Sequence, residues 1–350
     1  MGLQIGIIGL GRIGTGVLRS NFAYVPGGEF DIRVISGIVP VEQAAHMLRH
    51  DDTYGHPPFT VSHEGNNLVI DGKKISYCRI GQYSKPSEDD RLAELREFEL
   101  DLLFDTTGST SIGDFRSLVE RNIAKKTLSS WNVEGSDMSM VFGVNHTKYD
   151  PDQHYVISGT TCIGNAVTLL CHMLQINIGI DHARIVSIHS DLSDQMAAGC
   201  NGLSHSLDRA VSKAITPLSN DIGALTSLVL PELDRKIDSF SYQVSAGNVS
   251  VIDFTVQLSR DCTRDEIVDL FTTYAKDQLE GIVHCEFDAL SQQKTSIDYL
   301  GKPYSAIILM DHLVLKSQRQ LSLVIMLDSE YSYCCRILDV LGLIESNHSQ

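Results

Sequence analysis

The sequence predicts an α/β protein in which a doubly wound parallel sheet is joined to an α+β domain with a largely antiparallel sheet. The chain has 350 residues, more than one core of roughly 250 to 300 residues accommodates, so we expect two domains. Apolar strands alternate with helical segments in the first part, and β-rich segments dominate after about residue 160. The predicted boundaries place residues 1–161 and 328–350 in the first domain and residues 162–327 in the second.

The elements of the first domain follow one another in a β-α-β order. LQIGIIG predicts a strand, Ile13 to Phe22 a helix, and DIRVIS a second strand. NNLVIDGKKISY carries Asp71-Gly72 between two β-rich runs, which is typical of a hairpin. DLLFDTTG predicts a further strand that ends in a turn.

The second domain begins with a predicted apolar helix from about Cys162 to Leu174. Strands are predicted in ARIVSIHS, SFSYQVS, NVSVIDFTVQLS and LSLVIMLDS. The closing segment, Tyr333 to Leu343, has apolar residues at helical spacing, and we expect it to fold back onto the first domain.

The composition excludes several classes of protein. With 43% apolar and 21% charged residues the chain is typical of a globular protein, and its net charge of −16 argues against nucleic acid as a partner. No apolar run approaches the roughly 20 residues that cross a bilayer, and no targeting segment is visible, so we expect a cytoplasmic protein without a membrane partner. The 8 cysteines form no CxxC pair, so neither a metal site nor a disulfide framework is expected.

The stretch IIGLGRIGTG has the glycine spacing of a Rossmann-type dinucleotide loop. Gly9 permits a sharp bend, Gly11 lets the backbone approach a pyrophosphate, and Gly14 lets the following helix pack on the strand, with Arg12 and Ile13 between them. Because the stretch lies between an apolar strand and a helix, the context that this motif requires is present. The sequence therefore predicts a site for NAD or NADP.

The choice between these two cofactors depends on the end of the second strand. NAD-binding loops place a carboxylate there, whereas this chain has Ser36 and no carboxylate until Glu42. A carboxylate repels a 2′-phosphate, and a hydroxyl with the neighbouring Gly37 amide tolerates one. The pattern favours NADP over NAD, although the sequence places no obvious arginine to bind the 2′-phosphate.

A second signal is ISGTTCIGN, where a strand runs into a helix with Cys162 at the junction. A thiol at a helix N-terminus is made more nucleophilic, and VSIHSDLSDQ supplies His189 as a candidate base for it.

Together with further motifs, these segments resemble the glyceraldehyde-3-phosphate dehydrogenase family over nearly the whole chain. The matching motifs are GLGRIG, DDTYG, NLVIDGKKI, TTG, FGVN, TCIGN, PEL, NVSVIDFT and DSEYSYCCRI. The resemblance implies a catalytic second domain in which Cys162 attacks an aldehyde, His189 acts as the base, and an enzyme thioester forms. It also implies a homotetramer, and it places further cofactor contacts at Thr107, Gly108, Ser130, Ser329 and Tyr333.

The chain departs from this family at the positions that bind phosphate. The replacements are Gln243 and Leu192 on the substrate side, and Ile163, Asn220, Asp221, Ser206 and Leu207 on the attacking-phosphate side, with Arg209 retained. By the same comparison, the substrate pocket is expected to contain Thr161, Asp191, Arg209, Asn220, Asp221 and Gln243. We therefore expect a small unphosphorylated aldehyde as substrate, or an activated acid in the reverse direction.

Three points stay open: the role of the acidic residues, the class of substrate, and whether the protein is catalytically active. The acidic residues Asp191, Asp194 and Asp221 form either a solvated face or a pocket for a cationic or polyhydroxy aldehyde. A sugar-phosphate dehydrogenase with Arg209 or Lys213 as new phosphate ligands is a second enzyme hypothesis. The third is a catalytically silent homologue that binds dinucleotide and acts as a regulatory subunit.

Overall fold

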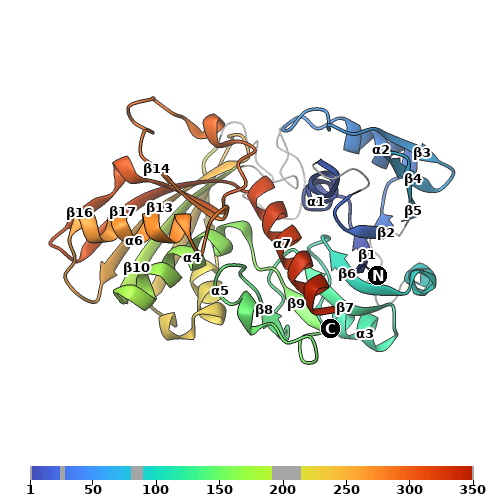
Figure 1. Ribbon diagram of the computed structural model, residues 1–350, viewed down its shortest axis with the longest axis horizontal. Helices are drawn as coiled ribbons and strands as arrows, with labels where there is room; N and C mark the ends of the chain where they lie inside the picture. The colour runs from blue at the N-terminus through green and yellow to red at the C-terminus, as the bar shows by residue number, and fades with distance from the viewer. Residues whose placement is uncertain (1, 24–27, 80–89, 191–213, 349–350) are drawn as a thin grey trace. The chain divides into compact units, whose positions relative to one another are not determined.

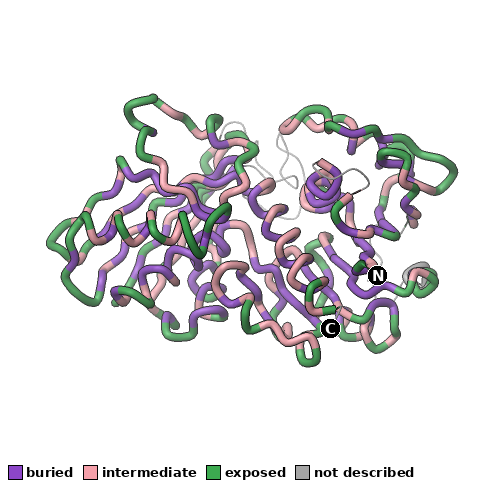
Figure 2. Tube along the Cα trace, viewed as in Figure 1, coloured by how far each residue is buried: buried purple, intermediate pink, exposed green. Residues whose placement is uncertain are grey.

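The chain folds into two compact units, described here from a computed structural model that covers residues 2–23, 28–79, 90–190 and 214–348 (Figure 1). One unit contains Met1–Thr161 together with Cys334–Gln350, and the other contains Cys162–Tyr333. Each unit is built on one large sheet, and buried residues follow the strands of both sheets (Figure 2). The predicted α/β class, with one mainly parallel and one mainly antiparallel sheet, is confirmed.

The first unit contains a nine-stranded sheet in the order β3-β4-β5-β2-β1-β6-β7-β9-β8. Every pairing from β5 to β8 is parallel, and only β3–β4 and β4–β5 are antiparallel. The antiparallel β4–β5 pair turns at Asp71-Gly72, as the hairpin motif predicts. The strands are β1 (Gln4–Ile8), β2 (Asp31–Gly37), β3 (Val61–Glu64), β4 (Asn67–Ile70), β5 (Lys73–Arg79), β6 (Leu100–Asp105), β7 (Ala124–Ser129), β8 (Met138–Ser139) and β9 (Val156–Ser158).

The central strands of this sheet are buried on both faces. All six residues of β6 are buried, as are four of the five residues of β1, which accounts for their nearly continuous apolar sequences. The helices are α1 (Arg12–Ala23), α2 (Val41–Arg49) and α3 (Ile112–Glu120), with single-turn or 3-10 segments at Asp90–Phe98 and His146–Lys148. Helix α3 begins with a capping box, in which Ser111 and Asp114 satisfy each other's backbone amides.

The last helix, α7 (Tyr331–His348), joins the first unit from Cys334 onward. The Cys334 thiol lies 3.8 Å from the carbonyl oxygen of Ile13 on α1. A Cβ on Gly16 would lie 2.7 Å from the Cys334 sulfur, so glycine is needed for this close packing of the two helices.

The second unit contains a sheet in the order β11-β12-β10-β13-β17-β15-β14, with β16 paired to β17. Most pairs are antiparallel, and β10–β12 and β14–β15 are parallel. The strands are β10 (Ile180–Ser190), β11 (Thr216–Ser219), β12 (Ile237–Val244), β13 (Val249–Leu258), β14 (Val283–Glu286), β15 (Ala306–Leu309), β16 (Val314–Lys316) and β17 (Gln320–Asp328). The helices are α4 (Cys162–Asn177), α5 (Ile222–Val229) and α6 (Arg264–Lys276), with 3-10 turns at Pro231–Leu233, Ser296–Tyr299 and Met310–His312.

Burial alternates along β10 because only one face of its sheet is covered. Ala183, Ile185 and Ser187 are buried, whereas Arg184 and Ile188 are exposed. Helix α4 packs against β10, and 11 of its 16 residues are buried, in keeping with its mainly apolar sequence. Among the described helices, none is long and apolar enough to cross a membrane.

Candidate active site and dinucleotide cradle

The glycine loop after β1 forms a cradle that side chains cannot enter. Gly9 has a φ of +93°, and a Cβ there would lie 2.7 Å from the Thr106 hydroxyl. A Cβ on Gly14 would lie 2.3 Å from the carbonyl oxygen of Gly9, whereas the space beside Gly11 is open. The loop therefore packs tightly at both ends and leaves room for a ligand at Gly11.

Other predicted cofactor residues lie at the same sheet edge, because the carboxyl ends of parallel strands meet there. The amide of Thr106 donates to Ile8 at 2.8 Å, and the amide of Ser130 donates to Asp105 at 3.0 Å. Thr107 and Gly108, which follow β6, are exposed. A hollow of about 450 Å³ opens at this edge, lined by residues 110–112 after β6 and residues 131–135 after β7.

Asp105 holds the turn after β6 in place. Its carboxylate accepts hydrogen bonds from the Thr110 hydroxyl at 2.5 Å and the Thr107 amide at 2.7 Å. Burial raises the pKa of Asp105, and these hydrogen bonds oppose the shift only in part. The turn that carries Thr107 and Gly108 is thus anchored from the protein interior.

Arg12 lies in the glycine loop and pairs with Asp51 at 2.7 Å. Burial acts to raise the pKa of Asp51, but the Tyr54 amide and the Arg12 guanidinium outweigh it, and the pKa is lowered. The Arg12 guanidinium also lies 5.9 Å from the centre of the Tyr54 ring. Arg12 therefore connects the glycine loop to the segment after α2 through this ion pair. The carbonyl group of its neighbour Ile13 contacts Cys334 of α7.

Ser36 occupies the end of β2, where its hydroxyl is buried without a hydrogen-bond partner among the described residues. Its carbonyl accepts from the Gly9 amide at 2.8 Å, which joins β2 to the loop. The open space at Gly11, the packed glycines and this unpaired hydroxyl fit a dinucleotide bound along the edge of β1 and β2. Gly9, Gly11, Gly14, Thr107, Gly108 and Ser130 are the residues that would hold it.

In the second unit, Cys162 and His189 lie close together. Cys162 is the first residue of α4, His189 is near the end of β10, and the Cys162 sulfur lies 3.8 Å from Nε2 of His189. Nδ1 of His189 donates to the carbonyl of Ser190 at 2.8 Å, so Nε2 faces the thiol. Burial opposes protonation of His189, but Cys162, the Ser190 carbonyl and Glu330 outweigh it and raise its pKa to about 9.

The turn before α4 is strained. Thr160 has a φ of +57° and is almost fully buried, a conformation that costs a β-branched residue about 1 to 3 kcal/mol. Thr161 follows it, half-buried, and directly precedes Cys162. Such strain is typical of sites that hold a reactive side chain in a set direction.

Neutral polar groups surround the position of His189 in the sheet. Gln243 is buried and pairs with His189 across β10 and β12. Two residues before Gln243, the Ser241 hydroxyl lies 2.5 Å from that of Ser187 and accepts from the Asn220 side chain at 2.7 Å. These four side chains carry no charge, whereas Glu330 is a charged residue that contributes to the raised pKa of His189.

The remaining predicted site residues have various locations. Asp221 is exposed at the N-terminus of α5, and Ile163 is buried in α4. Ser329 is buried and donates to the Ser250 hydroxyl at 2.7 Å, and Tyr333 is also buried. Asp191, Asp194, Ser206, Arg209 and Lys213 lie outside the described residues, as do Leu192 and Leu207.

Sequence reasoning missed two charged residues near the predicted sites. Glu330 contributes to the raised pKa of His189, and its signal was the acid within DSEYSYCCRI. Arg79 lies opposite Gly37 in the β2–β5 pairing, and no motif marks it.

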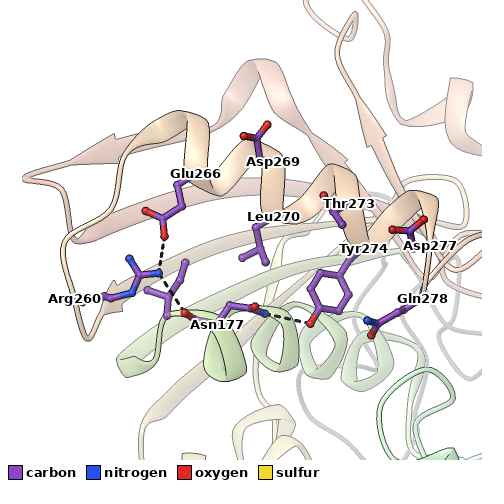
Figure 3. A pocket seen from close by; sticks show the side chains of 10 residues that line it. Asn177, Arg260, Glu266, Asp269, Leu270, Thr273, Tyr274, Asp277 and Gln278 are labelled. Carbon is purple, nitrogen blue, oxygen red and sulfur yellow. Dashed lines mark hydrogen bonds and ion pairs between the residues drawn. The ribbon is translucent and has the colours of Figure 1, made fainter.

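A separate hollow of about 450 Å³ lies between α4 and α6 (Figure 3). Arg260 pairs with Glu266 at 2.5 Å, and the Asn177 amide donates to the Tyr274 hydroxyl at 3.2 Å. None of the predicted site residues within the described ranges lines this hollow.

A parallel sheet with a glycine cradle, joined to a unit that carries a cysteine–histidine pair, defines a nicotinamide-dependent oxidoreductase. Residues 3–111 match the model "Glyceraldehyde 3-phosphate dehydrogenase, NAD binding domain", and residues 161–329 match the C-terminal domain of the same enzyme. The chain belongs to the glyceraldehyde-3-phosphate dehydrogenase family, which confirms the resemblance seen in its motifs.

Curated relatives match over almost their full length. Glyceraldehyde-3-phosphate dehydrogenase from Geobacillus stearothermophilus is 29% identical over 347 residues, which cover 99% of each chain. The enzymes of the same name from Kitasatospora aureofaciens and Wickerhamomyces ciferrii are 30% and 32% identical. The matches cover 97% and 99% of this chain and 98% and 100% of those relatives.

Proposed function

We propose that the protein is an NAD(P)-dependent dehydrogenase for a small unphosphorylated aldehyde, or a reductase of an activated acid, that works through a thioester on Cys162. The observation that carries this proposal is the neutral set of groups beside His189, where the family resemblance places phosphate ligands. Charge-assisted hydrogen bonds to an anion contribute about 1.5 to 3 kcal/mol each. Loss of one arginine and one threonine ligand therefore lowers phosphate affinity by about two to four orders of magnitude.

The geometry of Cys162 and His189 gives each a defined task. With a pKa of about 9, His189 holds a proton at neutral pH and faces the sulfur as an imidazolium. The sulfur attacks the carbonyl carbon, the C–S bond forms, and the carbonyl oxygen takes the proton from Nε2. Nε2 then takes that hydroxyl proton back as the hydrogen on carbon leaves with its electron pair, which produces the thioester.

A bound nicotinamide supplies the acceptor for this hydride. Hydrolysis of the thioester by water then yields the acid and regenerates the Cys162 thiol. The hydrogen bond from Nδ1 to Ser190 keeps the same ring nitrogen directed at the reacting atoms throughout.

The cofactor and the assembly are part of the same proposal. NAD(H) use is supported by the matched NAD-binding domain, and a preference for NADP is supported by the absence of a carboxylate at the end of β2. The first unit would bind the dinucleotide and the second the substrate. A homotetramer is supported by the open face of the second sheet, where the exposed side chains of Ile188 and Tyr242 pair across β10 and β12. We also propose a cytoplasmic location.

A second candidate is a dehydrogenase of glyceraldehyde 3-phosphate or a similar sugar phosphate, and the names of the curated relatives favour it. A third is a catalytically silent, dinucleotide-binding regulatory subunit, which the retained Cys162–His189 pair speaks against.

The test is a screen of the purified protein with NAD and NADP against matched phosphorylated and unphosphorylated aldehydes. We expect turnover of an unphosphorylated aldehyde without inorganic phosphate, and no turnover in Cys162→Ser. Efficient phosphate-dependent oxidation of glyceraldehyde 3-phosphate would replace the proposal with the second candidate. Failure of iodoacetamide to label Cys162 at neutral pH would favour the silent protein.

A further inference from the structure

We propose that the buried carboxylate of Asp105 gives the dinucleotide site a preference for the oxidised form of the cofactor. The nicotinamide ring carries a positive charge in NAD⁺ and NADP⁺ and no charge in NADH and NADPH. The inference rests on the proposed function, because it takes a nicotinamide cofactor as the ligand of the first unit. Asp105 is the last residue of β6 and is fully buried.

The sheet order places Asp105 in the half of the site that would hold the nicotinamide. The order β5-β2-β1-β6-β7-β9 is that of a doubly wound dinucleotide-binding sheet, in which two mononucleotide halves meet at β1. The adenosine half follows the end of β2, so the nicotinamide half follows the ends of β6 and β7. Asp105 pairs with Ile8 of β1 on one side and with Ser129 of β7 on the other, and it therefore lies at the centre of this edge.

The carboxylate of Asp105 has uncharged partners among the described residues. One oxygen accepts a hydrogen bond from the Thr107 amide at 2.7 Å, and the other accepts one from the Thr110 hydroxyl at 2.5 Å. No basic side chain in the described part of the chain forms an ion pair with it. Burial raises the pKa of Asp105, but both hydrogen bonds oppose this shift because they favour the charged form of the carboxyl group.

A negative charge at this edge acts differently on the two forms of the cofactor. It repels the pyrophosphate of both forms equally, and it attracts only the oxidised nicotinamide ring. Because the carboxylate is buried, solvent and salt screen this attraction less than they screen a surface charge. At an effective dielectric of about 20, unit charges roughly 10 to 15 Å apart change a ratio of dissociation constants by about 5- to 15-fold.

Asp101 provides a matched control on the same strand. It is near the amino end of β6, is buried, and its carboxylate pairs with Lys125 at 2.7 Å. Its charge is therefore compensated, and it lies at the opposite end of the strand from the dinucleotide edge. Asparagine at either position removes one negative charge and keeps the shape of the side chain.

The experiment measures the dissociation constants of NAD⁺, NADH, NADP⁺ and NADPH by calorimetry at pH 8 and low salt. The quantity compared is the ratio of the constant for the reduced form to the constant for the oxidised form. We expect Asp105→Asn to lower this ratio by about 5- to 15-fold, and Asp101→Asn to change it by less than about twofold.

A second neutral variant covers the case in which Asp105→Asn does not fold. In Asp105→Ser the hydroxyl can still accept a hydrogen bond from the amide two residues further on, which keeps the turn without the charge. The same fall in the ratio is expected for it. A purely structural loss in the turn weakens the binding of both forms alike and leaves the ratio unchanged.

The contrary outcomes separate this inference from the proposed function. An unchanged ratio in folded Asp105→Asn or Asp105→Ser would overturn the role of the Asp105 charge and leave the dehydrogenase proposal intact. An equal fall of the ratio in Asp101→Asn would also overturn it, because a compensated charge at the far end of β6 should have no such effect. A wild-type protein that binds none of the four dinucleotides would remove the proposed function, and this inference with it.

Discussion

Replacement of His189 by glutamine should slow the alkylation of Cys162 at neutral pH by about 30-fold. The Cys162 sulfur and Nε2 of His189 are 3.8 Å apart. Opposite unit charges near this distance attract by about 4 kcal/mol at an effective dielectric of 20, and by about 1 kcal/mol in bulk water. Because the two side chains are partly buried, we take an attraction of about 2 kcal/mol, which lies between these two values. This energy corresponds to about 30-fold in the equilibrium between the ion pair and the neutral pair.

The assay is the second-order rate of iodoacetamide labelling, followed on the Cys162 peptide by mass spectrometry at low salt. Cys162→Ser gives the background, and His182→Gln removes another histidine from the same strand, β10. His189→Gln should lower the rate and His182→Gln should leave it unchanged. A His189→Gln rate within about twofold of wild type would refute the electrostatic reasoning. The loss of an attraction of about 2 kcal/mol between the two side chains should change the rate by much more than twofold.

Three further predictions concern stability and the cradle. Gly14→Ala should lower the melting temperature and abolish dinucleotide binding, because its Cβ would lie 2.3 Å from a loop carbonyl, whereas Gly11→Ala should leave the melting temperature unchanged. Asp51→Asn should cost about 1 to 2 kcal/mol of unfolding free energy above pH 5. Since the Arg12 pair contributes to the lowered pKa of Asp51, this difference should shrink as the pH falls below about 4 in acid unfolding curves. The pKa of His189 is raised to about 9, so wild type should have a larger free energy of unfolding than His189→Gln below about pH 6.5. Urea titrations should show that this difference in unfolding free energy decreases as the pH rises through 9.

The elements with strong local patterns were predictable from the sequence. The mainly apolar run that begins at Cys162 predicted α4, and the β-rich segment that contains His189 predicted β10, because helix and strand patterns depend only on near neighbours in the chain. The Asp71-Gly72 turn and the glycine loop were equally visible, since each needs backbone conformations that few residues adopt.

The predicted site residues were less fully described by their motifs. The motif around Cys162 predicted a nucleophile at a helix N-terminus, but not the strained turn at Thr160 or the part played by Glu330. The motifs also gave no sign that the Ser36 hydroxyl is buried without a hydrogen-bond partner among the described residues. Such details depend on packing, which residue spacing does not encode.

By itself the sequence determined the family and the glycine loop, and it predicted the cysteine and histidine of the proposed mechanism, because these depend on residue type and local order. Only the tertiary structure decided which way His189 presents its ring nitrogens and that Tyr77 fills the space beside Gly37. It also decided that Arg79 lies at the end of β2. The physical reason is that strand order and register bring together residues far apart in the chain, and a sheet of nine strands admits many orders that local pattern does not distinguish.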